Sequence, residues 1–354
     1  MPRNQMLKPY DLRFCKSFLT DTAEIFEPLT LPLAVCGAGL GVLKIASPFF
    51  RTQNEGICLF LSVIFGAVFE FMNIPVSVSA AEKFRFPPTA AALIGAVLGH
   101  FSASGNASDG TVLEYIGIFG IQIERTGYLY SPAVSVLAVF IASRIYDRGE
   151  PSKIPKAFSL YLSAAIGFLS VFFIIGPALR FVSSALLYIF IFLYSRVTIT
   201  DGAYIGAFYS FFSFFGVEGW LKDAESATMA LSGGNEVLPI VNSALSALGG
   251  ISFGIFLKKG KKGQKTEILL SSLASMLGYP QAAIFGIIIK DKRGILSAVL
   301  SGGIAGTVMK ILQTAKKRAL YINISLYISG IIIAFIIGCV VYLWIHKNRS
   351  PVKT

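Results

Sequence analysis

Four uninterrupted apolar runs constrain this chain more than any other feature of its sequence. They contain no Asp, Glu, Lys, Arg or His and cover Ala157 to Leu179, Val237 to Leu257, Ile268 to Ile289 and Ala319 to Ile345. Each matches the roughly 20 residues that a membrane-crossing helix needs. Charged residues make up 14% of the chain, against about 25% in a soluble domain. The sequence therefore predicts an all-α polytopic membrane protein and excludes a water-soluble globule.

Basic residues gather in short segments between the apolar runs and give the chain a formal net charge of +12. Segments 82–86, 144–156 and 258–265 are basic, which is typical of cytoplasmic loops. Because the charge is confined to such loops, it does not indicate a nucleic-acid partner. The four cysteines form neither a Cys-x-x-Cys pair nor a metal-ligand spacing. We therefore expect no metal and no cofactor, and a lipid bilayer as the surroundings.

The remaining apolar segments bring the expected number of transmembrane helices to about ten. Their predicted positions are 28–48, 56–81, 87–100, 126–146, 157–179, 181–195, 202–217, 237–257, 294–313 and 319–345. A cytoplasmic segment, 1–25, precedes them, and a basic tail, 347–354, follows. No nucleophile, base and orienting residue stand together, so no catalytic residues are predicted and the question of enzyme activity stays open.

The run 268–289 differs from the other apolar runs because Gly278-Tyr279-Pro280 lies at its middle. Glycine permits unusual backbone dihedrals, and proline removes a backbone donor and clashes with the preceding turn. We expect a re-entrant hairpin with both ends on the cytoplasmic side, where basic residues flank it. A proline-kinked helix that spans the membrane is the alternative.

Several segments, in a fixed order, resemble one family. They are Glu27 to Gly41, Ala80 to Phe84, Ile118 to Gly120, Tyr128 to Ser131, Ile175 to Pro177, Ser232 to Pro239 and Gly278 to Gly286. This pattern resembles the membrane-embedded IIC component of the bacterial phosphoenolpyruvate-dependent sugar phosphotransferase system. Within the glucose superfamily, it is most similar to the β-glucoside, sucrose and trehalose branch.

The resemblance implies a homodimeric sugar permease in the bacterial cytoplasmic (inner) membrane. It implies a scaffold and dimerisation half at 26–177 and a substrate-carrying half at 178–346, which moves the sugar in an elevator-like motion. Phosphorylation would come from separate IIB and IIA proteins. The chain would thus be the membrane subunit of a sugar phosphotransferase complex.

The resemblance also places the sugar-handling residues in the second half. Glu218, Asn235, Tyr279 and Gln281 are the expected substrate-binding residues. The family's histidine is Glu218 here and its signature carboxylate is Gln281, so we expect the two side chains to approach each other across a polar pocket. Glutamate and amide side chains supply the donors and acceptors that hydroxyl groups require. The alternative is that Glu218 only caps a helix or faces water.

Three other charged residues are candidates for a vestibule or gate. They are Lys83, within the Ala80 to Phe84 segment, and the adjacent pair Glu124 and Arg125. Adjacent charges at the edge of a span also occur simply at the membrane interface. Two other functions remain open for the chain: a IIC-like sensor or scaffold without transport, and a phosphorylation-independent facilitator or ion-coupled carrier that uses Glu218.

Overall fold

The computed structural model describes residues 12–50, 55–103, 115–118, 121–124, 132–148, 155–194, 200–215, 237–259, 264–318 and 324–347. The helices of its first part are α1 (Leu12–Phe26), α2 (Thr30–Phe50), α3 (Glu55–Glu70), α4 (Asn73–Phe84), α5 (Pro88–Ala103), α6 (Pro132–Arg148), α7 (Lys156–Ser170) and α8 (Gly176–Tyr194). Those of its second part are α9 (Thr200–Phe212), α11 (Val237–Lys259), α12 (Lys265–Met276), α13 (Gly294–Arg318) and α14 (Ile324–Lys347).

Six helical stretches of the described chain are long and apolar enough to cross a membrane. They are Leu19–Ala46, Gly56–Phe84, Lys156–Ile189, Val237–Lys258, Gly294–Thr314 and Tyr327–Lys347. Helix α5 adds a shorter apolar stretch, Pro88–His100. The helical membrane architecture expected from the sequence is thus confirmed, whereas the count of about ten transmembrane helices stays a prediction.

Two crossings that were expected to be separate, 157–179 and 181–195, form one continuous helical segment. Helix α7 leads through a π-helix, η3 (Val171–Ile175), directly into α8. The prediction placed a boundary at Arg180, but a single charged residue does not stop a helix. The proline that follows the π-helix, Pro177, lacks one backbone donor, and an extra residue in a π-turn is a common way to accommodate such a defect.

One short antiparallel hairpin interrupts the helices. Strand β1 (Tyr115–Ile118) pairs with β2 (Ile121–Glu124), with Tyr115 opposite Glu124. The all-α prediction did not include these strands. Their isoleucines alternate with other residues over only four positions in each strand, which is too short for a clear period-2 signal.

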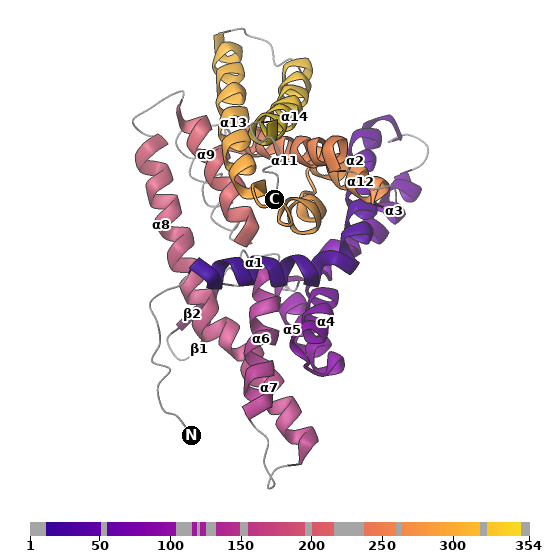
Figure 1. The fold of residues 1–354 in the computed structure, drawn as a ribbon, viewed down its shortest axis with the longest axis vertical. Coiled ribbons are helices and arrows are strands. Elements are labelled where there is room, and N and C mark those ends of the chain that lie inside the picture. Colours follow the sequence, from indigo (N-terminus) through magenta and orange to yellow (C-terminus); the bar gives the residue numbers. More distant parts are fainter. Residues whose placement is uncertain are drawn as a thin grey trace, which may run out of the picture.

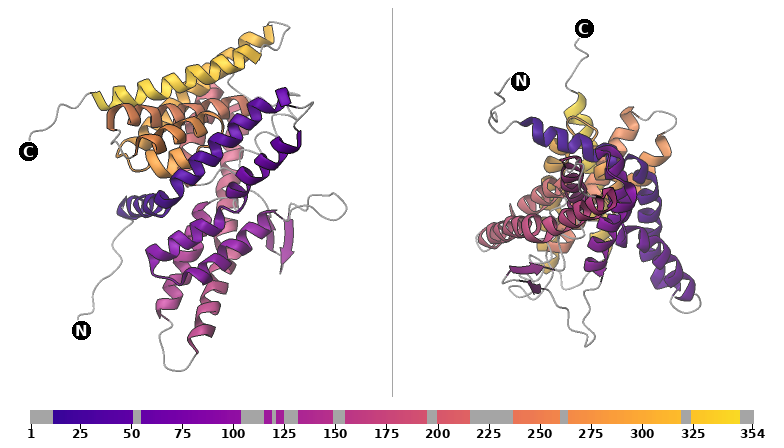
Figure 2. Two further views of the ribbon diagram at one scale, coloured as in Figure 1. Left: turned by 90° about the vertical axis from the view of Figure 1, so that its right-hand side faces the viewer. Right: turned by 90° about the horizontal axis from the view of Figure 1, so that it is seen from below.

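The helices gather in two groups on either side of α1 (Figure 1). Helices α4 to α7 lie on one side, and α9 and α11 to α14 lie on the other, with α8 running from the first group to the second. Helix α1 packs against α4 and also against the π-helix η5 (Ala282–Ile288) that follows α12. Figure 2 shows α14 lying along the outside of α11 to α13.

Small residues allow the helices of the second group to approach closely. A Cβ atom added to Gly250 of α11 would lie 1.9 Å from the backbone oxygen of Phe335 in α14, and one at Gly338 would lie 1.9 Å from the oxygen of Ala247. Gly206 and Gly302 bring α9 and α13 together in the same way. In a membrane, where no hydrophobic effect drives helices together, such close backbone contact supplies the van der Waals packing.

Candidate functional site

The apolar run 268–289 is broken at its centre. Helix α12 ends at Met276, and Gly278 follows with φ +101°, a conformation that residues with a Cβ rarely adopt. The Tyr279 amide donates to the Ala274 carbonyl oxygen at 2.8 Å and so closes the helix end. The chain then turns and continues through η5, which packs back against α12. These two limbs and the turn between them are called the hairpin below.

The tip of the hairpin packs against glycines of α2. A Cβ atom at Gly37 would lie 2.8 Å from the Cβ of Tyr279, and one at Gly41 would lie 2.2 Å from the Cβ of Leu277. The returning limb contacts the start of the same helix, where Thr30 lies against Gly286. Side chains on this face of α2 would therefore displace the hairpin.

Tyr279 lies partly buried at the tip, between α2 and α3. Its ring centroid is 5.1 Å from that of Phe69, and the Lys44 ammonium lies 5.3 Å from the centroid of the tyrosine ring. A cation over an aromatic face is attracted by the ring quadrupole. Tyr279 therefore joins the tip to the first two membrane helices, and it brings a phenol hydroxyl to the hairpin turn.

Gln281 stands just before η5 and, among the predicted site residues whose side chains the structure describes, it has a buried polar atom without a partner. Its Oε1 atom is buried and has no hydrogen-bond partner among the described residues. A buried polar atom without a partner costs about 1 to 3 kcal/mol. The arrangement thus favours a polar ligand or a polar side chain opposite this amide.

The first limb of the hairpin, helix α12, is fixed by hydrogen bonds to α11, whereas the Oε1 atom of Gln281 has no such bond among the described residues. Ser272 Oγ donates to the Gly249 oxygen at 2.8 Å, and Ser275 Oγ donates to the Leu245 oxygen at 2.7 Å. Both acceptors are backbone atoms of α11. Helix α12 is therefore fixed to α11 by two buried hydrogen bonds.

The two ends of the hairpin lie beside the corner between α1 and α2. Lys290 Nζ, after the returning limb, lies 3.6 Å from Oε2 of Glu27. Glu267 lies in the first turn of α12. Burial raises the pKa of the Glu267 carboxyl; the charge of Lys290 opposes this shift and that of Glu27 adds to it. The start and the end of the hairpin thus share one group of charges.

The other predicted site residues are placed only in part. Glu218, Asn235 and Arg125 lie outside the described residues, so the approach of Glu218 to Gln281 stays a prediction. Glu124 ends strand β2, and the structure describes its backbone alone.

Lys83 joins two helices. It bonds Glu24 and lies 3.3 Å from Oδ1 of Asp21, and so ties the end of α4 to α1. Its predicted role in a vestibule or gate stays a prediction.

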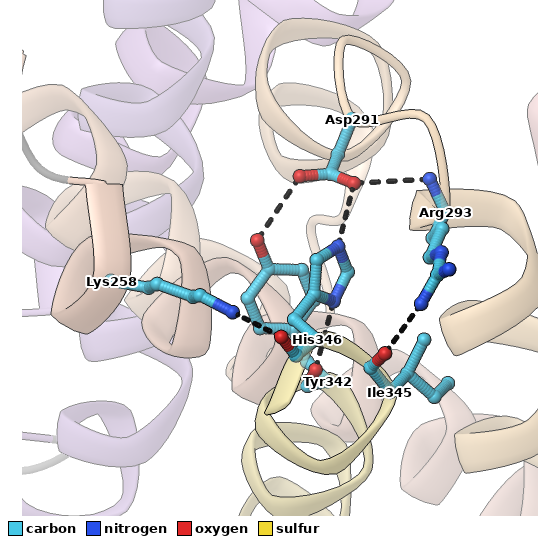
Figure 3. Close-up of polar contacts among 6 residues, drawn as sticks. All are labelled: Lys258, Asp291, Arg293, Tyr342, Ile345 and His346. Atoms are coloured by element: carbon cyan, nitrogen blue, oxygen red, sulfur yellow. Dashed lines mark hydrogen bonds and ion pairs between the residues drawn. The ribbon is translucent and has the colours of Figure 1, made fainter. Parts of the chain in front are cut away.

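The sequence reasoning missed a polar cluster at the exit of the hairpin (Figure 3). Asp291, in the turn before α13, contacts Tyr342 and His346 of α14, which lie 51 and 55 residues further along the chain. The only available signal was an aspartate between two apolar segments together with one of the two histidines of the chain.

An apolar cavity of about 370 Å³ lies between α6, α8 and α9. Its lining residues are Ala133, Val134, Leu137, Leu179, Val182, Phe211, Phe212 and Phe215. None of these side chains can bond a hydroxyl group, so the cavity does not fit a sugar. Among the described residues, no group of three or more His, Cys, Asp or Glu is placed to hold a metal ion. The hairpin therefore remains the best candidate site.

Comparison with known proteins identifies the family of this chain. The family model described as "Phosphotransferase system, EIIC" matches residues 29–302, which includes all of the hairpin. The chain belongs to this EIIC family. Together with its six apolar helical stretches, this membership makes it a multi-pass protein of the cytoplasmic membrane.

Curated relatives of this EIIC chain are longer than it is. It is 25% identical over 303 residues to the sucrose-specific EIIBC component of the PTS system from Bacillus subtilis, covering 83% of this chain and 64% of the relative. It is 26% identical over 292 residues to the sucrose-specific EIIBC component from Klebsiella pneumoniae, with 80% and 64% covered. It is 26% identical over 324 residues to the β-glucoside-specific EIIBCA component from Halalkalibacterium halodurans, with 87% and 50% covered. The chain thus spans about half to two thirds of the length of these relatives.

Proposed function

We propose that this chain is a sugar permease subunit that carries a sugar across the cytoplasmic membrane for phosphorylation by separate IIB and IIA proteins. The buried, unpartnered Oε1 atom of Gln281, at the turn of a broken helix in an EIIC chain, carries this proposal. Broken helices at membrane depth persist where they line a cavity or are buried in protein, and they commonly form transporter sites. The names of the relatives suggest sucrose or a β-glucoside as the sugar.

The chemistry of the site follows from the amide. A glutamine side chain offers one acceptor oxygen and two N–H donors, so it can bond adjacent hydroxyl groups of a sugar in both directions. A sugar hydroxyl that donates a hydrogen bond to Oε1 would remove the free-energy cost of burying this oxygen without a partner. The hydroxyl of Tyr279 supplies a further donor and acceptor at the same turn. Glu218 and Asn235 belong to this proposed site.

We further infer that both ends of the hairpin face the cytoplasm. Glu267 at the start and Lys290 at the end are both close enough to Glu27 to interact with its charge, which supports a chain that enters and leaves on one side. The basic segments that flank the hairpin favour the same side. The sugar site would then lie at the depth of the Gly278 turn.

The division of labour is part of the proposal. Residues 26–177 would form the scaffold and the dimer contacts, and residues 178–346 would carry the sugar. The grouping of α4 to α7 away from α9 and α11 to α14 supports this division (Figure 1). Helix α2 departs from this division, because it belongs to the first range and yet packs on the hairpin, and Phe69 of α3 and Glu27 also contact the hairpin or its end.

Uptake of labelled sucrose and of a labelled β-glucoside into proteoliposomes tests the proposal. Uptake that depends on purified IIB, and that Gln281→Ala reduces at least tenfold, would support it. Ser62→Ala is the matched control, because the hydroxyl of this partly exposed serine donates to the Leu59 oxygen within its own helix. Uptake without IIB would indicate a facilitator or carrier, and no uptake of any sugar would favour a sensor or scaffold.

A further inference from the structure

Three parts of the chain meet at the C-terminal end of α14 (Figure 3). Lys258 Nζ, at the end of α11, donates to the backbone oxygen of His346 at 2.7 Å. Arg293 Nη1, from the turn before α13, donates to the backbone oxygen of Ile345 at 2.6 Å. Cations at a helix C-terminus satisfy its last carbonyl groups. Two basic side chains are therefore held in fixed positions at this end of the helix.

The acidic side chain of this region is used inside the protein. Asp291 is almost completely buried, with 9% of its surface exposed. Tyr342 Oη donates to its Oδ2 at 3.0 Å, and the Arg293 backbone amide donates to its Oδ1 at 3.0 Å. His346 Nε2 lies 3.1 Å from the same Oδ1. The carboxylate thus fixes the turn to α14, and it is not exposed beside the basic side chains.

Four basic residues from these three parts of the chain form a patch that we call the basic corner: Lys258, Lys292, Arg293 and Lys347. The lysines are exposed and the arginine is half-buried. Each bond to α14 uses one N–H, whereas an ammonium or a guanidinium group has several. The C-termini of α11 and α14 offset only about half a charge each. The corner therefore keeps a positive charge and further donors, a combination that fits an anion.

An apolar ridge leads along α14 to the basic corner. Its members follow one another at intervals of four residues and are between 45% and 63% exposed: Ile328, Ile332, Ile336, Val340 and Trp344. Residues at this spacing form a continuous ridge on a helix. Helix α14 lies along the outside of α11 to α13 and is apolar enough to cross the membrane, so exposed side chains on it face acyl chains (Figure 2).

The end of this ridge marks the level of the membrane surface. Tryptophan is enriched where the bilayer meets water, and Trp344 stands three residues before Lys347. Residues at this spacing are neighbours on a helix surface. The ridge therefore places acyl chains directly beside the basic corner.

We propose that the basic corner binds the phosphate headgroup of an anionic phospholipid whose acyl chains lie along the apolar ridge. Basic segments mark the cytoplasmic side of a membrane protein, and anionic lipids give that leaflet a negative surface potential. The charge of the corner selects an anionic lipid over a neutral one, and the ridge selects a lipid over free phosphate. A lipid bound there joins α11, the exit of the hairpin and α14. The site does not depend on the proposed transport of a sugar.

Quenching of tryptophan fluorescence by lipids with brominated acyl chains tests the proposal. The chain has two tryptophans, and Trp220→Phe leaves Trp344 as the only one. This variant is reconstituted into phosphatidylcholine vesicles that contain a small fraction of brominated phosphatidylglycerol. Parallel vesicles contain the same fraction of brominated phosphatidylcholine with the same acyl chains. Phosphatidylglycerol should quench Trp344 more strongly, and equal quenching by the two lipids would overturn the proposal.

Substitutions in the same background locate the site. Lys347→Gln should lower the relative affinity for phosphatidylglycerol about fivefold, because a basic residue near an anionic surface contributes about 1 kcal/mol. Lys347→Arg keeps the charge and should keep the affinity. Lys156→Gln is the matched control, because it removes an exposed lysine at the start of α7. An equal loss in Lys347→Gln and Lys156→Gln would indicate diffuse attraction and would overturn the site.

Inorganic phosphate, added at constant ionic strength, distinguishes a lipid from a free anion. It should leave the quenching unchanged, and a loss of the preference for phosphatidylglycerol would overturn the lipid as the ligand.

Native mass spectrometry of the wild-type chain, incubated with equimolar phosphatidylglycerol and phosphatidylcholine, decides if Trp220→Phe does not fold. An excess of bound phosphatidylglycerol that Lys347→Gln reduces would support the site, and equal amounts of the two lipids would overturn it. Neither measurement uses a sugar or a IIB protein. A chain that takes up no sugar but prefers phosphatidylglycerol would therefore remove the proposed function and keep the lipid site.

Discussion

Substituting Gly278 by alanine tests whether the backbone at the hairpin turn requires glycine. Gly278 has φ +101°, and a Cβ atom built there would meet no heavy atom within 4 Å. The substitution therefore adds backbone strain without a side-chain clash. Holding a residue that has a Cβ in such a conformation costs about 1 to 3 kcal/mol. We expect Gly278→Ala to lower the free energy of unfolding by this amount.

The matched control is Gly66→Ala. A Cβ atom at Gly66 also meets nothing within 4 Å, but this residue lies inside helix α3. Alanine is the better helix former by about 1 kcal/mol, so this variant should be as stable as the wild type or slightly more stable. The two alanines thus differ in the backbone conformation that they must adopt.

Thermal inactivation in detergent, followed by the monodisperse fraction in size-exclusion chromatography, compares the variants. Unfolding of membrane proteins in detergent is often irreversible, so the half-life at one temperature is the appropriate measure. A shorter half-life for Gly278→Ala and an unchanged or longer one for Gly66→Ala are expected. Equal half-lives for the two variants would refute the argument that the turn depends on a glycine conformation.

Three further predictions concern packing, pH and topology. Gly250→Ala should destabilise the protein by at least about 2 kcal/mol, because its Cβ would overlap a backbone oxygen of α14, and thermal inactivation measures this. The raised pKa of Glu267 means that the folded state keeps this proton to higher pH than the unfolded state, so the contribution of this group to stability declines as the pH rises above its unfolded-state pKa of about 4.3. Denaturation of Glu267→Gln should lack that decline, and an identical pH profile would contradict the assignment. Single cysteines at Lys265→Cys and Lys292→Cys should react with an impermeant reagent from the same face of oriented vesicles, whereas labelling from opposite faces would mean a spanning helix.

The sequence predicted most of the helices because their signal is local. A long run without charges requires a helix in a bilayer, where backbone groups must find partners within the segment. The break at Gly278-Tyr279-Pro280 was visible for the same reason, since the conformational properties of glycine and proline do not depend on distant residues. The continuity of α7 and α8 was missed because the charge of Arg180 was interpreted as a helix boundary. A charged side chain does not interrupt the backbone hydrogen bonds of a helix, so the helix continues through this position.

The contacts of the site were less accessible from the sequence. Asp291 and His346 are 55 residues apart, and their meeting depends on how α14 crosses the hairpin, which no local pattern encodes. The role of α2 was hidden in the same way. The sequence does not indicate what its glycines pack against, and the structure identifies the partners of Gly37 and Gly41 as Tyr279 and Leu277 of the hairpin tip.

The two serine bonds between α12 and α11 determine which parts of the chain can move together. Ser272 and Ser275 would each lose a buried hydrogen bond, worth about 0.5 to 1.5 kcal/mol, if α12 slid along α11. Helix α11 is in turn packed backbone to backbone against α14 through Gly250 and Gly338. If the hairpin moves in transport, these contacts would transmit its displacement to the C-terminal helix. A fluorophore on the exposed Trp344 side of α14 would then report movement of the proposed sugar site without any label near the hairpin turn.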